Sequence, residues 1–158
     1  RRRNAETDYH RRFKMLRGGN PRAVVRVSNK QVTCQLVAYE KDGDRVISTI
    51  TGKTLVESYK WPKEASRKSV PACYLAGYAL AKSAISRGFE SAILDIGLAA
   101  SSKGNRAYAA LKGMVDAGLN IPHSQNILPS EERISGEHIG DEIQNAVAVS
   151  KESMESDK

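Results

Sequence analysis

Residues 22–51 read RAVVRVSNKQVTCQLVAYEKDGDRVISTIT, and this stretch predicts how the fold begins. Apolar and polar residues alternate through 22–29 and again through 31–40, which is the period of a β-strand with one buried face. Asn29-Lys30 between them is short enough for a hairpin, and the KDGD turn leads into a third strand at 45–51. The stretch therefore predicts three sequential antiparallel strands, a meander.

The following hundred residues predict helices packed on this sheet. Residues 71–86 are rich in small side chains and predict a helix, with Pro71 in its first turn and Gly88 after its end. Residues 91–100, SAILDIGLAA, predict a fourth strand that is apolar enough to be buried on both faces. A helix is predicted at 105–117. The order βββ-α-β-α predicts an α/β fold with a mixed sheet.

The remaining segments give weaker patterns. The polar stretch 52–69 is predicted as mostly loop with a short helix at 53–59, and its Trp61 either anchors that loop or faces a partner. Residues 119–136 contain two prolines and are predicted to be extended. A last helix is predicted near 137–150, with the final eight residues frayed.

The chain is long enough to bury a sizeable core, and its charge is unevenly placed. Residues 1–30 carry a net charge of +8, whereas residues 131–158 carry −5. We expect a basic arm at 1–22, a globular α/β domain at 23–120, and an extended C-terminal segment with a terminal helix at 121–158.

The sequence also indicates the cellular compartment in which the protein folds. No apolar run is long enough for a transmembrane helix, and the start lacks both a Met and a signal-peptide core, so we expect a soluble protein whose native first residues are missing here. Cys34 and Cys73 lie far apart, which favours two buried reduced thiols in a cytosolic protein over a disulfide.

The basic arm interleaves apolar residues with its charge. Placed on a helix, residues 5–17 form a narrow apolar stripe and leave the basic side chains on the rest of the surface. This pattern predicts an anionic partner, with the stripe packed either on the sheet or on an unstacked base. A membrane surface or an acidic protein would also fit, but the stripe is short and poor in Leu and Trp. The stripe consists of Ala5, Tyr9, Phe13 and Leu16.

Catalytic patterns are scarce. His10, His123 and His138 lie in unrelated segments, and we find neither metal-ligand spacing nor a nucleophile elbow. Asp95 in a strand, with acids in the KDGD turn, leaves a metal-dependent nuclease of ribonuclease-H-like fold as an alternative, although a buried Asp95 is better explained by a basic or backbone partner. The loop at 101–106 is either a phosphate contact at a helix N-terminus or an ordinary loop capped by Asn105.

Four blocks of sequence together resemble one family. TDYHRRFKMLRGGNPRAVVRVSNKQVTCQLV, AILDIGL, KGNRAYAALKGMVDAGLNIPHS and ERISGEHI occur here in the order found in ribosomal protein eighteen of the large subunit, in its archaeal and eukaryotic branch. The resemblance implies a protein that is not an enzyme and needs no cofactor or metal. It implies binding to 5S rRNA and, with neighbouring ribosomal proteins, attachment of that RNA to large-subunit rRNA in the central protuberance of the cytoplasmic ribosome, with no membrane partner.

Charge and resemblance together place the RNA surface on the arm and on the strand behind it. Seven of the eight basic residues in 1–22 are Arg, whose planar guanidinium binds phosphate bidentately and stacks. A-form RNA is recognised by shape, phosphate, 2′-hydroxyl and stacking, which suits such a surface. The predicted RNA-binding residues are Arg1, Arg2, Arg3, Tyr9, His10, Arg11, Arg12, Lys14, Arg17, Arg22, Arg26, Asn29 and Lys30, followed in rank by Lys53, Lys103 and Arg106.

Overall fold

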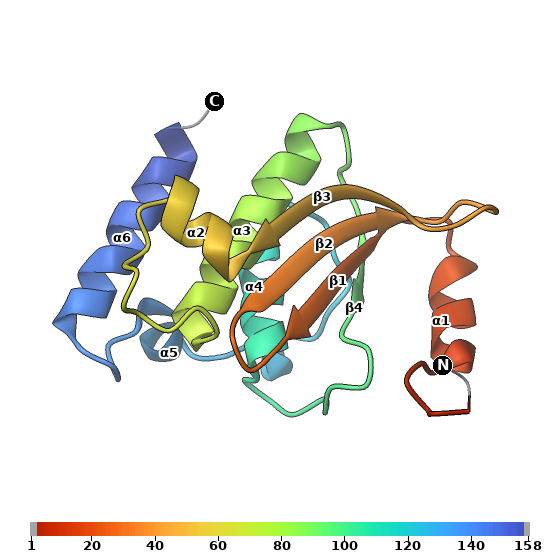
Figure 1. Ribbon diagram of the computed structural model, residues 1–158, viewed down its shortest axis with the longest axis horizontal. Coiled ribbons are helices and arrows are strands. Elements are labelled where there is room, and N and C mark those ends of the chain that lie inside the picture. Colours follow the sequence, from red (N-terminus) through yellow and green to blue (C-terminus); the bar gives the residue numbers. More distant parts are fainter. Residues whose placement is uncertain (1–2, 157–158) are drawn as a thin grey trace.

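A four-stranded sheet in the order β3-β2-β1-β4 forms the centre of the computed structural model, which describes residues 3–156 (Figure 1). β1 and β2 form the predicted antiparallel hairpin, and β3 continues antiparallel to β2. β4 lies parallel to β1 at the opposite edge, so the predicted mixed sheet is confirmed. The strands are β1 (Arg22–Val27), β2 (Val32–Ala38), β3 (Arg45–Thr51) and β4 (Ile93–Asp95).

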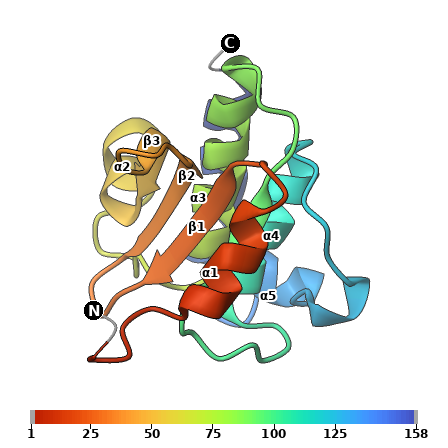
Figure 2. The same ribbon diagram turned by 90° about the vertical axis from the view of Figure 1, so that its right-hand side faces the viewer.

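Helices cover one face of this sheet, while α1 stands apart beside its far end (Figures 1 and 2). α3 packs against β2 and β3, and α4 packs against β1 and along α3. α2, α5 and α6 pack against α3 in turn. None of the described helices has the length and apolar character needed to span a bilayer. The helices are α1 (Tyr9–Leu16), α2 (Gly52–Ser58), α3 (Val70–Ser86), α4 (Arg106–Asp116), α5 (Glu131–Ser135) and α6 (Asp141–Ser156), with a 3-10 turn, η1, at Gln125–Ile127.

Two glycines let α3 and α4 touch backbone to backbone. A Cβ atom added to Gly77 would lie 2.0 Å from the carbonyl oxygen of Ala110, and one added to Gly113 would lie 2.0 Å from that of Tyr74. The small side chains of α3 are therefore needed for this contact, because bulkier residues would hold the helices apart. Since α4 packs on β1, the contact also fixes the start of α4 relative to the sheet.

The predicted fourth strand is shorter and less buried than expected. β4 ends at Asp95, and Gly97, with a φ of +63°, turns the chain into a loop. Ile93 and Leu94 are only partly buried, because β4 is an edge strand rather than an interior one. The prediction of a strand buried on both faces was therefore wrong, and the residues after β4 are free to line a site.

The C-terminal segment is more helical than predicted. α5 interrupts the stretch expected to be extended, and α6 continues to Ser156, so the prediction of a frayed end was wrong for residues 151–156, while 157–158 lie outside the described residues. Met154 is buried in the core, and the hydroxyl of Tyr78 donates to the Glu155 carboxylate over 3.1 Å. These contacts with α3 hold the last turns in helical form.

The structure decides between the alternatives that the sequence left open for Trp61 and for the two cysteines. Trp61 is buried, so it anchors the loop rather than facing a partner. Cys34 and Cys73 are free and buried, as predicted for reduced thiols. Burial raises the pKa of Cys73 to about 12, which the nearby charge of Arg106 offsets in part.

Candidate nucleic-acid interface

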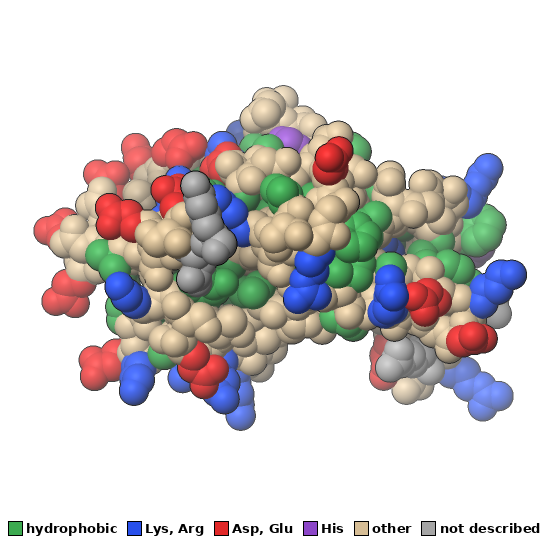
Figure 3. Space-filling model, turned by 90° about the horizontal axis from the view of Figure 1, so that it is seen from above, with side chains coloured by type: hydrophobic (Ala, Val, Ile, Leu, Met, Phe, Trp, Pro, Cys, Tyr) green, Lys and Arg blue, Asp and Glu red, His purple; other side chains and the backbone are tan. Residues whose placement is uncertain are grey.

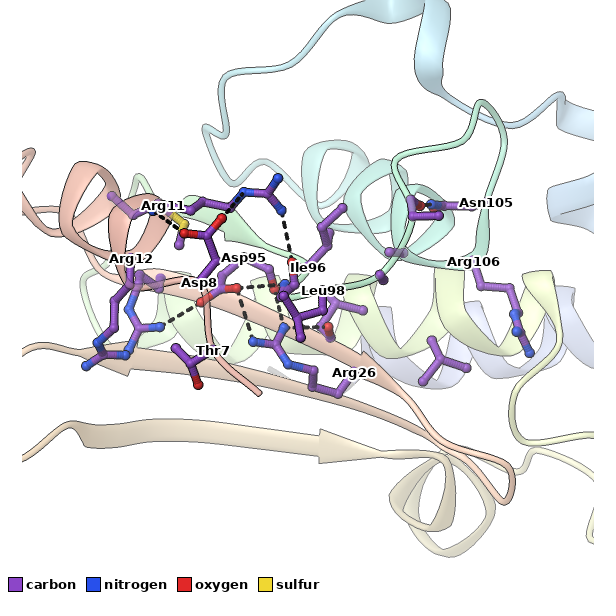
Figure 4. Close-up of a pocket in the computed structure, with 18 of the residues that line it drawn as sticks. Thr7, Asp8, Arg11, Arg12, Arg26, Asp95, Ile96, Leu98, Asn105 and Arg106 are labelled. Carbon is purple, nitrogen blue, oxygen red and sulfur yellow. Dashed lines mark hydrogen bonds and ion pairs between the residues drawn. The ribbon is translucent and has the colours of Figure 1, made fainter. Parts of the chain in front are cut away.

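A hollow of about 930 Å³ opens between α1, β1 and the loop that follows β4 (Figure 4). Its lining brings together residues that lie far apart in the sequence. Figure 4 shows Arg11 and Arg12 of α1 at one end, Arg26 of β1 in the middle, and Arg106 at the start of α4 at the other end. The fold thus gathers predicted RNA-binding arginines from three elements around one hollow.

Asp95 holds two arginines and the loop after β4 in place in this hollow. Its carboxylate accepts hydrogen bonds from Arg22 over 2.7 Å, from Arg26 over 3.1 Å and from the backbone N–H of Gly97 over 2.9 Å. Burial alone would raise the pKa of Asp95, but the charge of Arg26, the Gly97 N–H and the two arginine hydrogen bonds outweigh it, so the pKa is lowered. Asp95 therefore has the basic and backbone partners that the sequence indicated.

Arg26 is held in place while part of it stays open to solvent. Its Nη1 donates to the backbone oxygens of Val25 over 2.8 Å and Asp95 over 2.7 Å, and 48% of the side chain is exposed. Gly97 has a φ of +63°, which L side chains rarely adopt, and a Cβ atom there would come within 2.8 Å of the Arg26 Cζ, so a larger residue would strain the loop and displace this guanidinium. The exposed edge of Arg26 is thus presented at a fixed position.

Polar contacts attach α1 to the sheet end. Asp8 caps the helix by accepting from the backbone N–H of Arg11, and the Arg11 side chain donates to the Gly97 oxygen over 3.0 Å. The Nη2 of Arg12 donates to both carboxylate oxygens of Asp44, over 2.9 and 2.8 Å. Asp44 lies in the β2–β3 turn, so one of the two acids of the KDGD sequence holds the arm.

The apolar stripe of the arm does not pack on the sheet. The helix begins at Tyr9, and Tyr9 and Phe13 are 46% and 65% exposed. Of the two alternatives left open for the stripe, packing on the sheet is not observed, because an ion pair of Arg12 and a backbone contact of Arg11 hold α1 instead; stacking on an unpaired base stays a prediction. Two aromatic side chains are left available to a partner.

Arg22 has a different position from the one predicted for an RNA-binding residue. It is 4% exposed, and its guanidinium joins Asp95 at 2.7 Å to Asp44 at 2.6 Å. Because Asp44 and Asp95 enclose its guanidinium, Arg22 links β1 to β4 and to the β2–β3 turn beneath the surface, and it is not exposed to a partner. The same pairing commits Asp44 and Asp95 to arginine, which leaves the nuclease alternative without support.

The β1–β2 hairpin extends the basic surface from the hollow towards α2. Asn29 and Lys30 are exposed in the hairpin loop, and the preceding Ser28 lines the hollow. The backbone N–H of Lys53, in the first turn of α2, donates to the Gln31 side chain over 3.0 Å, so Lys53 lies next to the hairpin. Its ammonium group pairs with Glu57 at 3.3 Å.

The loop before α4 is compatible with both interpretations given above, a phosphate contact and an ordinary loop capped by Asn105. Asn105 caps α4 by accepting from the Tyr108 N–H over 2.8 Å, and Arg106 next to it lines the hollow. Lys103 is exposed outside the lining. The exposed Leu98, which also lines the hollow, was missed because its segment reads as a strand; Gly97 before it was the available signal.

The other predicted residues lie on the arm. Within residues 3–156, no ion pair involves Arg3, Lys14 or Arg17, and all three are exposed together with His10. Arg1 and Arg2, also predicted to bind RNA, lie outside the described residues.

At the scale of the whole molecule, acidic side chains gather at the end that carries α6, and basic ones project near α1 (Figure 3).

Comparison with known proteins identifies the family of this chain. Residues 1–91 and 86–124 match a family described as "Ribosomal large subunit proteins 60S L5, and 50S L18". The large ribosomal subunit protein uL18 of Korarchaeum cryptofilum is 48% identical over 139 residues, which cover 88% of this chain and 70% of the relative. The chain belongs to the uL18 family.

Other archaeal uL18 proteins match over nearly the whole chain. That of Methanoculleus marisnigri is 45% identical over 157 residues, covering 94% of this chain and 88% of its own. That of Aeropyrum pernix is 41% identical over 155 residues, covering 98% and 70%. The resemblance seen in the sequence is thereby confirmed, and uL18 proteins are structural components of the ribosome rather than enzymes.

Proposed function

We propose that this chain, as a structural protein of the large ribosomal subunit, binds 5S rRNA and helps attach it to large-subunit rRNA in the central protuberance. Membership of the uL18 family supports a place in the cytoplasmic ribosome with rRNA and ribosomal proteins as partners. The 5S rRNA and the central protuberance are what the sequence resemblance implies.

The observation that carries the proposal is the hollow that Arg11, Arg26 and Arg106 line along its length. Asp95 and Gly97 fix the first two guanidinium groups before any partner arrives, so little side-chain entropy remains to be lost on binding. Guanidinium groups bind phosphate oxygens in pairs, which suits an RNA backbone laid across the hollow.

The exposed aromatic residues of α1 add a second mode of contact. Tyr9 and Phe13 project from the helix that contains Lys14 and that Arg17 caps at its C-terminus. Base–aromatic stacking contributes about 1–3 kcal/mol per base, and it requires an unpaired base of the kind found in RNA loops. We therefore assign the arm to a folded RNA with an accessible loop rather than to a regular duplex.

The salt dependence of binding to a 5S rRNA transcript tests this function. If about six phosphates are neutralised, the plot of log K against log salt concentration should have a slope near −5. The variant Lys14→Gln/Arg17→Gln/Arg106→Gln should have a slope shallower by about three, because each lost phosphate contact removes about one. None of these three side chains has an ion pair in the described structure, so the fold should not change.

A matched variant controls for net charge. Lys63→Gln/Lys82→Gln/Lys151→Gln removes the same charge from positions outside both the arm and the hollow and should keep most of the wild-type slope. A slope near zero for the wild-type protein, or equal losses for the two triple variants, would contradict the proposal. Transfer RNA as a competitor measures the preference for 5S rRNA over another folded RNA of similar size.

A further inference from the structure

A second hollow, of about 440 Å³, lies where the N-terminal ends of α3 and α4 meet α5. It shares Asn105 and Arg106 with the first hollow, so the two adjoin across the start of α4. The loop before α3 forms another side, with Lys68 and Ser69, and Arg133 of α5 contributes a third. Neither Lys68 nor Arg133 belongs to the RNA surface predicted from the sequence.

The charge of this second hollow is positive and uncompensated. Its lining includes the cations Lys68, Arg106 and Arg133 together with His138, and none of the described residues that line it is an acid. Within residues 3–156, none of these four side chains forms an ion pair. In the first hollow, by contrast, Asp44 and Asp95 neutralise several arginines. Like charges gathered without counter-ions repel one another, so an anion bound here would relieve that repulsion.

Two helix dipoles add to the same potential. Ser69 caps the 17-residue α3 by accepting from the Ala72 N–H, and Asn105 caps the 11-residue α4. The partial positive charge of both N-termini therefore faces the hollow. Arg106 lies near enough to the start of α3 for its charge to lower the pKa of Cys73 against the effect of burial.

We propose that the second hollow binds a phosphodiester of the rRNA backbone, as an RNA contact separate from the arm. This inference rests on the proposed function for the choice of rRNA as the partner. Arginines and helix N-termini arriving from several directions suit the tetrahedral oxygens of a phosphate. Because Arg106 borders both hollows, one RNA strand crossing the start of α4 would contact both.

The test compares a hollow variant with a matched control in the full chain. Lys68→Gln/Arg133→Gln removes two lining cations, and Lys63→Gln/Lys82→Gln removes two cations that line neither hollow. Each protein is titrated with a 5S rRNA transcript and, separately, with a large-subunit rRNA transcript at several salt concentrations. We expect the hollow variant to bind one RNA roughly tenfold more weakly at 0.15 M salt, with a log–log slope shallower by about two.

The titrations with the two transcripts identify the source of the phosphate, since a loss of affinity confined to one transcript assigns the hollow to that RNA. Equal affinities of the hollow variant and its control for both transcripts would overturn the inference. So would unchanged RNA binding accompanied by loss of binding to a poly-glutamate peptide, which would indicate an acidic protein partner. An arm variant, Lys14→Gln/Arg17→Gln, separates the two proposals: normal 5S rRNA binding by the arm variant contradicts the proposed function, whereas normal binding of both transcripts by the hollow variant contradicts only this inference.

Discussion

Replacement of Asp95 by alanine should lower the free energy of unfolding by about 3 kcal/mol. Asp95 and Arg22 are 5% and 4% exposed, so the variant leaves the Arg22 guanidinium buried without the more deeply buried of its two carboxylate partners. Removing one member of a buried pair costs about 3–5 kcal/mol. The lower end applies here because Asp44, at 2.6 Å, remains as a counter-charge for Arg22.

Urea denaturation followed by circular dichroism measures this loss. The slope of the free energy against urea should stay unchanged, since the variant removes an interaction and not a folded region. Glu57→Ala breaks the exposed pair with Lys53 and provides the control, with an expected change below about 0.5 kcal/mol. If Asp95→Ala were destabilised by less than about 1 kcal/mol, the view that a buried carboxylate organises the hollow would be wrong.

The same variant should also weaken 5S rRNA binding under conditions in which it remains folded. Without Asp95, the Gly97 N–H and the Arg26 guanidinium lose a shared acceptor, and Gly97 in turn supports Arg11 of the arm. The double variant Arg22→Ala/Asp95→Ala then shows whether stability and RNA binding depend on the pair as a unit, through the coupling energy of the cycle.

Four further outcomes follow from particular contacts. Gly113→Ala should destabilise the fold by about 1–3 kcal/mol in thermal unfolding, because its Cβ would lie 2.0 Å from the α3 backbone; a gain in stability would contradict the close helix contact. Because its pKa is lowered in the folded state, ionised Asp95 stabilises the fold at pH values above the ordinary carboxyl pKa, and this stability is lost as the pH falls below about 4. The wild-type protein should therefore lose more free energy of unfolding than Asp95→Ala between pH 7 and pH 3. Phe13→Ala should weaken rRNA binding while changing the free energy of unfolding by less than about 0.5 kcal/mol, since the ring is exposed; a large loss of stability would mean that the stripe packs internally. A thiol reagent at pH 8 should modify Cys34 and Cys73 only on unfolding, because burial raises both pKa values; rapid modification of the native protein would show that these sites open.

The sequence by itself determined the elements whose signals are local. Alternation in 22–51 was enough for the β1–β2–β3 meander, and small residues between Pro71 and Gly88 were enough for α3, because side-chain periodicity and cap chemistry depend on near neighbours. The four ordered blocks were enough for the family. Sequence also located the arm and its charge, since charge is a property of composition.

Only the tertiary structure decided which of these charges are available. It buried Arg22 between two carboxylates, turned Phe13 outward, and placed Lys68 beside Arg133 in a hollow that no sequence pattern marks. It also kept α6 helical to Ser156 through contacts with α3. The physical reason is the same in each case: burial and ion pairing depend on residues dozens of positions away, and the packing of α3, α4 and the sheet sets their distances.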